Sequence, residues 1–236
     1  MLLKTSFQFC SVAWNSKNND LNLIALANKC FSCYTCNGKR GGSMNKKELF
    51  IDEINYLKND DIKKSVAILI EMLPDYFFHE AASSTGKYHP KYALGDGGLL
   101  RHTKAACYIA HELLNDPAIG EKYTSREKDL MIVGLIMHDG LKRGLQEERY
   151  TRFDHPLLAA NFVYDNRAKA GISEDEALFL KEVISSHMGP WTKDYNGNEV
   201  LPYPKTKYQN FVHMCDYLAS RKGLLVPFDS NNNILL

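Results

Sequence analysis

This 236-residue chain contains no long apolar run and no large excess of charge of one sign. No stretch approaches the roughly 20 apolar residues that a membrane-spanning helix needs, and polar residues interrupt the short apolar stretches near the N-terminus. We therefore expect neither a membrane anchor nor a signal peptide. The formal net charge is +1, so no overall basic field points to duplex nucleic acid. With six cysteines and no export signal, the sequence predicts a cytoplasmic protein with reduced thiols.

Residues 1–43 differ in composition from the rest of the chain and show no helical period. Cys30, Cys33 and Cys36 follow a C-x2-C-x2-C spacing, which together with Cys10 would suit a zinc or iron–sulfur site. Alternatively, residues 39–44 are encoded by a purine-rich ribosome-binding site that runs into a start codon. We favour this second interpretation, in which residues 1–43 are a non-native or disordered leader and Met44 starts a single domain, 44–236.

From residue 46 onward, the apolar residues recur with the period of a helix and predict an all-α fold. Ser173 and Glu176 form a capping-box pattern, and Asp154 stands where an N-cap would open a helix at His155 and Pro156. Polar loops separate the helices at 79–96 and 189–206. The expected helices cover 46–58, 60–74, 98–115, 125–139, a segment opening at 155, 173–187 and 205–221.

The most informative segment is residues 130–137, which are apolar almost all round and run directly into His138 and Asp139. A helix of this kind is buried in the core of a domain. An imidazole and a carboxylate at its buried end cost several kcal/mol each unless something pairs with them. A bound divalent metal ion would satisfy both.

Other histidines and one aspartate fall on apolar helix faces in the same way. His102 shares a stripe with Leu99 and Ala106, whereas Lys104 falls on another face of the same helix. A single buried histidine is more often a hydrogen-bonded core residue, but a set of six polar side chains needs a common partner. The predicted metal ligands are His102, His138, Asp139, His155, His187 and Asp216.

The chemistry of this donor set indicates which ions it would hold. Imidazole nitrogens mixed with carboxylates suit Mn, Fe, Co, Ni or Zn as divalent ions. Asp139 is expected to bridge two ions, the first bound also by His102, His138 and Asp216, and the second by His155 and His187. Such a site lowers the pKa of a bound water and neutralises charge on a phosphoryl group.

Four segments of the chain resemble the motifs of the HD phosphohydrolase superfamily. Residues 97–103 resemble its GGLL-x-HT segment, and His138-Asp139-Gly140-Leu141-Lys142 resembles its HD-x-G-K signature. Residues 184–189 and 212–218 resemble its third and fourth blocks. The order and spacing are most similar to the HD domain of Gram-positive 3′→5′ exoribonucleases and to uncharacterised HD proteins of bacteria and phages.

This resemblance covers residues 79–221, the core of the expected domain. It implies an α-helical HD-domain bundle around a metal site, with metal-dependent phosphohydrolase or phosphodiesterase activity on nucleotides or phosphodiesters. Leu141 departs from the pattern, because the family has glycine at that position. No oligonucleotide-binding barrel precedes the HD segment, which lowers the expectation of a processive RNA substrate.

The expected substrate is a nucleotide or a short single-stranded nucleic acid. Lys142 and Arg143 follow the ligands directly and would hold a phosphate, with Asp139 and Lys142 as the catalytic residues. His89 lies in a loop that resembles one preceding the first ligand in this subgroup, and Trp191 and Tyr203 would stack on a base. The alternative is a non-catalytic module that keeps the metal site for nucleotide binding or sensing.

Overall fold

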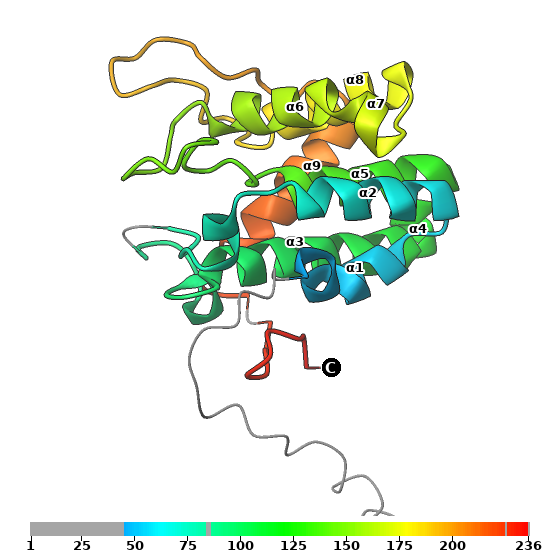
Figure 1. The fold of residues 1–236 in the computed structure, drawn as a ribbon, viewed down its shortest axis with the longest axis horizontal. Helices are drawn as coiled ribbons and strands as arrows, with labels where there is room; N and C mark the ends of the chain where they lie inside the picture. The colour runs from blue at the N-terminus through cyan, green and yellow to red at the C-terminus, as the bar shows by residue number, and fades with distance from the viewer. Residues whose placement is uncertain (1–44, 84–85, 225, 236) are drawn as a thin grey trace, which may run out of the picture. The chain divides into compact units, whose positions relative to one another are not determined.

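Helices form the regular secondary structure of the part of the chain that the computed structural model describes, residues 45–83, 86–224 and 226–235 (Figure 1). Within these ranges β structure is limited to two isolated bridges, Lys193 with Glu199 and Phe228 with Ile234. The predicted all-α fold is confirmed. The cysteine run, Cys10 and the expected start at Met44 lie outside the described residues.

The α-helices are α1 (Ile51–Tyr56), α2 (Asp60–Glu71), α3 (Gly98–Asn115), α4 (Pro117–Gly120), α5 (Ser125–Met137), α6 (His155–Asp165), α7 (Arg167–Ala170), α8 (Glu174–Ser185) and α9 (Lys207–Ala219). Three short 3₁₀ helices are η1 (Lys46–Phe50), η2 (Asp75–Phe78) and η3 (Lys91–Ala93). None of these helices is long and apolar enough to cross a membrane.

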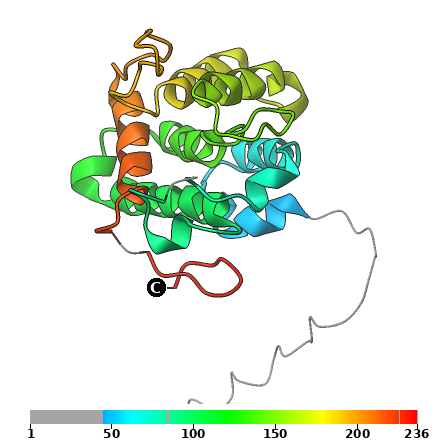
Figure 2. The same cartoon turned by 90° about the vertical axis from the view of Figure 1, so that its left-hand side faces the viewer.

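Helix α5 occupies the centre of the bundle. It packs against α3 and α8, and α6 packs closely on α8 (Figure 1). Helix α9 runs across the bundle and contacts α3, α5 and α8, which Figure 2 shows from the side. The C-terminal end of α5 therefore lies among elements that are far apart in the sequence.

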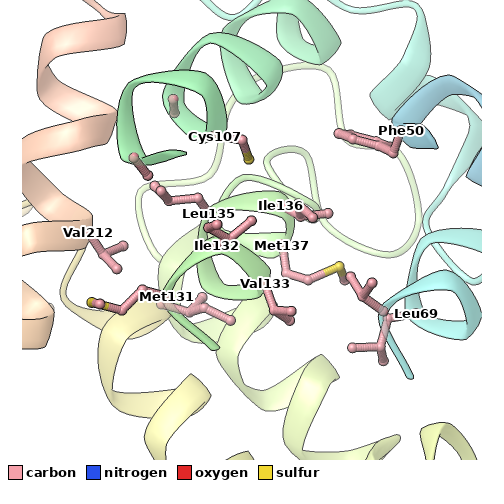
Figure 3. Close-up of a cluster of buried hydrophobic side chains, with 14 of the residues drawn as sticks. Phe50, Leu69, Cys107, Met131, Ile132, Val133, Leu135, Ile136, Met137 and Val212 are labelled. Atoms are coloured by element: carbon pink, nitrogen blue, oxygen red, sulfur yellow. The ribbon is translucent and has the colours of Figure 1, made fainter. Parts of the chain in front are cut away.

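The sequence explains why α5 can be buried along its length. Its N-terminus is fixed by a capping box in which Thr124 Oγ1 accepts a hydrogen bond from the Glu127 N–H, and the Glu127 carboxylate accepts one from the Thr124 N–H. Residues 130–137 are all buried, and Figure 3 shows side chains of η1, α2, α3 and α9 gathered around them. Gly134 permits a close approach to α8, because a Cβ there would lie 2.9 Å from Val183 Cγ2.

Several helix ends differ from the expectations; α2, for example, ends at Glu71 and not at residue 74. The expected helix 46–58 is divided into η1 and α1, and α5 ends at Met137 with His138 as its C-cap. Asp154 stands at the N-cap of α6, but its side chain makes no capping hydrogen bond and instead accepts two hydrogen bonds from Arg152, each 2.8 Å long. The predicted N-cap position is therefore confirmed, but the carboxylate pairs with the neighbouring guanidinium and does not cap the helix. The capping box of Ser173 and Glu176 is confirmed.

A buried ion pair links the first helical segment to α3. Lys104 Nζ lies 3.0 Å from Glu53 Oε2, and both side chains are almost fully buried. Lys104 also donates a hydrogen bond of 2.8 Å to the carbonyl of Leu49. The face of α3 that carries Lys104 is therefore covered by η1 and α1.

Candidate metal centre

The structure brings the six predicted metal ligands together from five separate parts of the fold. His102 lies in α3, His138 and Asp139 directly follow α5, and His155 is the first residue of α6. His187 lies two residues beyond α8, and Asp216 lies in α9. The four histidines and Asp139 are each at most 3% exposed, so the cluster lies inside the bundle.

The two carboxylate oxygens of Asp139 face different pairs of histidines. Oδ1 lies 3.0 Å from Nε2 of His155 and 3.7 Å from Nε2 of His187. Oδ2 lies 3.5 Å from Nε2 of His138 and 3.8 Å from Nε2 of His102. Asp139 is thus the centre of the cluster, with one oxygen for each half.

Asp216 adds a second carboxylate on the side of His102. Its Oδ1 lies 2.9 Å from Nε2 of His102 and 3.5 Å from Nε2 of His138. Three groups of ligand atoms lie within 4.8 Å of one another and can hold a metal ion: His102, His138 and Asp139; His138, His187 and Asp216; and Asp139, His155 and His187.

Backbone carbonyls fix the orientation of three imidazole rings. Because a carbonyl oxygen only accepts, the Nδ1 atom that faces it must carry the proton and Nε2 keeps a free lone pair. This leaves three Nε2 lone pairs directed into the cluster, as in metal-binding histidines. The pairs are Nδ1 of His138 with the Leu135 carbonyl at 2.6 Å, His155 with Arg152 at 2.7 Å and His187 with Ile184 at 2.8 Å.

Several of these inward-facing atoms are buried without a hydrogen bond. Nε2 of His138, Nε2 of His155 and Oδ1 of Asp139 have no hydrogen-bond partner in the described part of the chain. Two acceptors 3.0 Å apart, such as His155 Nε2 and Asp139 Oδ1, repel each other unless a cation lies between them. The donor set therefore fits a metal ion. A proton bound to an imidazole nitrogen would compete with the metal ion for the same lone pair.

The charges in the cluster suit a cation as well. Burial acts to raise the pKa of Asp139 and Asp216, but Lys142 beside Asp139 and the histidines beside both hold each pKa well below the usual range. Burial acts to lower the pKa of His138, but the two carboxylates outweigh it and raise the pKa. Burial together with His138 lowers the pKa of His187 to about 3. The carboxylates are thus anionic and His187 is neutral, which are the forms that bind metal.

A cavity of about 530 Å³ gives access to this cluster. Its volume lies within the roughly 300–1,000 Å³ typical of sites for small ligands. His138 is fully buried behind its wall. The predicted residues that line it are His102, Asp139, His155, His187, Asp216, His89, Lys142 and Trp191.

Three predicted substrate-contact residues lie at this cavity: Lys142, His89 and Trp191. Lys142 Nζ lies 2.5 Å from Asp139 Oδ2, so the lysine reaches the cluster of histidines and aspartates although Leu141 replaces the glycine of the motif. The ring of His89 lies 5.4 Å from that of His102, and its Nδ1 has no partner among the residues described. Burial lowers the pKa of His89 to about 3, so its imidazole is neutral.

Two other predicted contacts lie elsewhere. Arg143 does not line the cavity, and its guanidinium pairs with Glu80 and, at 3.1 Å, with Glu147. Tyr203 is 57% exposed and also lies outside the cavity lining. The surroundings of these two side chains therefore give no support for a substrate contact.

The sequence interpretation missed part of the cavity wall. Tyr88, Tyr217 and Arg221 line the cavity, and the ring of Trp191 stacks on that of Tyr217 with centroids 5.9 Å apart. Tyr217 and Arg221 follow the predicted ligand Asp216 at a spacing that places them on one side of the end of α9. This spacing was the sequence signal that could have identified Tyr217 and Arg221 as neighbours.

A tight turn after α8 positions His187. His213 Nδ1 lies 2.7 Å from the His187 carbonyl oxygen. Gly189 has a φ of +65°, and a Cβ there would lie 2.2 Å from the His213 ring. Glycine is thus required twice at this turn, for its backbone angle and for the space that His213 fills.

Comparison with protein-family models, with curated proteins and with solved structures finds no match for this chain. The likeness to HD phosphohydrolases therefore depends on the sequence motifs. The geometry of the cluster stands independently of that likeness.

Proposed function

We propose that this protein is a metal-dependent phosphohydrolase of the HD type that acts on a nucleotide or a short single-stranded nucleic acid. The observation that carries the proposal is the buried cluster of four histidines and two aspartates, with unpaired Nε2 lone pairs, at the wall of a cavity of nucleotide size. Such a donor set serves hydrolysis when substrate can reach it, and the cavity provides that access.

In the proposed centre, Asp139 would be a ligand of two ions. His102, His138 and Asp216 would hold the first with Asp139, and His155 and His187 the second. The division of the Asp139 oxygens between the two pairs of histidines supports this assignment. Nitrogen and carboxylate ligands together favour Mn, Fe, Co, Ni or Zn.

When bound, the ions supply a water of lowered pKa and neutralise charge on a phosphoryl group. The side chains of the protein orient the substrate. Lys142 places an ammonium group beside Asp139, where it can hold a phosphate oxygen of the substrate. His89 is neutral and adds no charge to this wall, and the half-exposed Trp191 ring offers a surface for a base.

A panel of substrates and metals tests the proposal directly. The purified protein, first stripped with a chelator, is assayed with nucleoside monophosphates, dinucleotides, short oligonucleotides and bis(p-nitrophenyl) phosphate. Each is tested with added Mn²⁺, Co²⁺, Ni²⁺ or Mg²⁺. Hydrolysis that depends on a transition metal is expected. Bound metal without turnover of any substrate would contradict catalysis and favour the non-catalytic binding module.

The two-ion arrangement predicts the metal content of histidine variants. His155→Ala and His187→Ala should each lower the bound metal by about one equivalent per chain, because both residues serve the second ion. Metal analysis of the purified proteins measures this. His79→Ala is the matched control, since His79 lies outside the cluster and pairs with Asp96 near the surface. An unchanged stoichiometry in both cluster variants would exclude the dinuclear arrangement.

Lys142 should affect substrate binding more than metal binding. Lys142→Ala is expected to raise KM about 10- to 100-fold, because a hydrogen bond to a charged group contributes about 1.5–3 kcal/mol. Metal content should stay as in the wild type, since no ligand is removed. Steady-state kinetics and metal analysis of the same preparation measure both quantities, and Lys142→Arg should retain part of the binding. Loss of metal from Lys142→Ala would instead assign the lysine to the support of Asp139.

A further inference from the structure

Three aromatic rings and a cation contact one another along one wall of the cavity. The ring of Trp191 stacks on Tyr217 with an interplanar angle of 17°. The guanidinium carbon of Arg221 lies 4.3 Å from the ring centroid of Tyr217 and 5.7 Å from that of Tyr88. All four side chains line the cavity that gives access to the histidine and aspartate cluster. Contacts with an aromatic face hold a guanidinium in place without using its hydrogen-bond donors.

Arg221 lacks an acidic partner of the kind that Arg126, Arg143, Arg152 and Arg167 have. Arg126, Arg143 and Arg167 each pair with at least one glutamate. Nε and Nη2 of Arg221 donate to the Ser220 hydroxyl, at 3.1 and 2.7 Å, and no carboxylate among the described residues pairs with Arg221. A half-buried guanidinium in a ligand-sized cavity, held by rings and free of carboxylates, is suited to bind an anion.

Arg221 and Lys142 have different partners in this cavity. Lys142 contacts Asp139, whereas Arg221 lies between Tyr217 and Tyr88, just beyond the end of α9. A phosphate that Lys142 holds beside Asp139 leaves the Arg221 guanidinium, which pairs with neither of these residues, open to a second anion. Two cations at different places in one cavity fit a ligand with two phosphate groups.

We propose that Arg221 binds a second, non-scissile phosphate of the substrate, so that the preferred substrate is a short single-stranded nucleic acid with a 5′ phosphate and not a nucleoside monophosphate. This inference rests on the proposed function, because it places the scissile phosphate at the metal cluster. The planar guanidinium can bind two phosphate oxygens at once, and the adjoining Trp191 ring provides a surface for the base between the two phosphates.

The test compares a dinucleotide that carries a 5′ phosphate with the same dinucleotide without it. In the wild type, kcat/KM for the phosphorylated form should be at least about 10-fold higher, as a charge-assisted hydrogen bond of about 1.5–3 kcal/mol implies. In Arg221→Gln this ratio should fall to near one, mainly through KM. Lys222→Gln, which removes the same charge from an exposed neighbour outside the cavity, should keep the wild-type ratio.

Calorimetric binding of the same two dinucleotides to chelator-treated protein separates this inference from the proposed function. A binding preference for the 5′ phosphate that is lost in Arg221→Gln supports the role of Arg221 even if no substrate is hydrolysed. Equal binding and equal turnover of both dinucleotides by the wild type would overturn the inference, while metal-dependent turnover of either would leave the proposed function standing. Thermal unfolding of each variant verifies that it is folded.

Discussion

Replacing Asp139 with asparagine should lower kcat/KM by about 10²–10³-fold or more. Asp139 is the carboxylate whose two oxygens face all four histidines of the cluster. The amide keeps the shape of the side chain but removes the negative charge that holds cations at a site otherwise rich in neutral imidazole. Loss of one such electrostatic contribution corresponds to about 3–4 kcal/mol in the activation barrier. Steady-state kinetics with the substrate found for the wild type measures the change.

A second buried aspartate provides the control for this variant. The Asp129 carboxylate lies in α5 and accepts hydrogen bonds from the backbone N–H groups of Lys58 and Asn59, outside the cavity. Asp129→Asn should lower the melting temperature and leave turnover per folded molecule unchanged. Asp139→Asn should show the opposite pattern, with a protein that stays folded and has lost its activity. Near-wild-type turnover by Asp139→Asn would refute the metal-hydrolase interpretation of this chain.

The convergence of the six ligands could be predicted from the sequence because burial is readable from apolar periodicity. His138 and Asp139 follow a run of apolar residues that only a central helix can bury, and His102 lies on an apolar stripe of α3. The cost of an unpaired polar side chain in a core then requires a shared partner. Apolar periodicity indicated which residues would form the cluster. It did not indicate that each oxygen of Asp139 faces a different pair of histidines.

Other features depend on contacts that sequence spacing does not encode. Tyr217 and Arg221 are four residues apart at the end of α9, but this spacing does not reveal that Tyr88, from a loop before α3, completes the wall beside Arg221. The choice of Arg143 as a phosphate contact considered only its position after the ligands, whereas Glu80, more than 60 residues earlier, takes its guanidinium. Long-range ion pairs of this kind become visible only in three dimensions.

The ion pair of Lys104 and Glu53 is a further example, and it predicts the largest change in stability. Lys104 lies off the apolar stripe of His102, so the sequence suggested a different face for it, yet its side chain is 2% exposed. Glu53→Leu would leave a buried ammonium group with the Leu49 carbonyl as its remaining hydrogen-bond partner. Breaking a buried pair in this way costs about 3–5 kcal/mol of the free energy of unfolding.

The double variant Glu53→Leu/Lys104→Met should recover most of that loss. Burial raises the pKa of Glu53 although Lys104 acts to lower it, and Glu53 Oε1 has no hydrogen-bond partner in the described chain. The pair therefore does not fully compensate its own desolvation, and apolar side chains of similar volume can replace it. Urea unfolding of both variants measures the two free energies, and Asp52→Leu on the exposed side of α1 should change stability by less than about 0.5 kcal/mol. A double variant as unstable as Glu53→Leu alone would instead mean that the pair is required for the packing of α1 on α3.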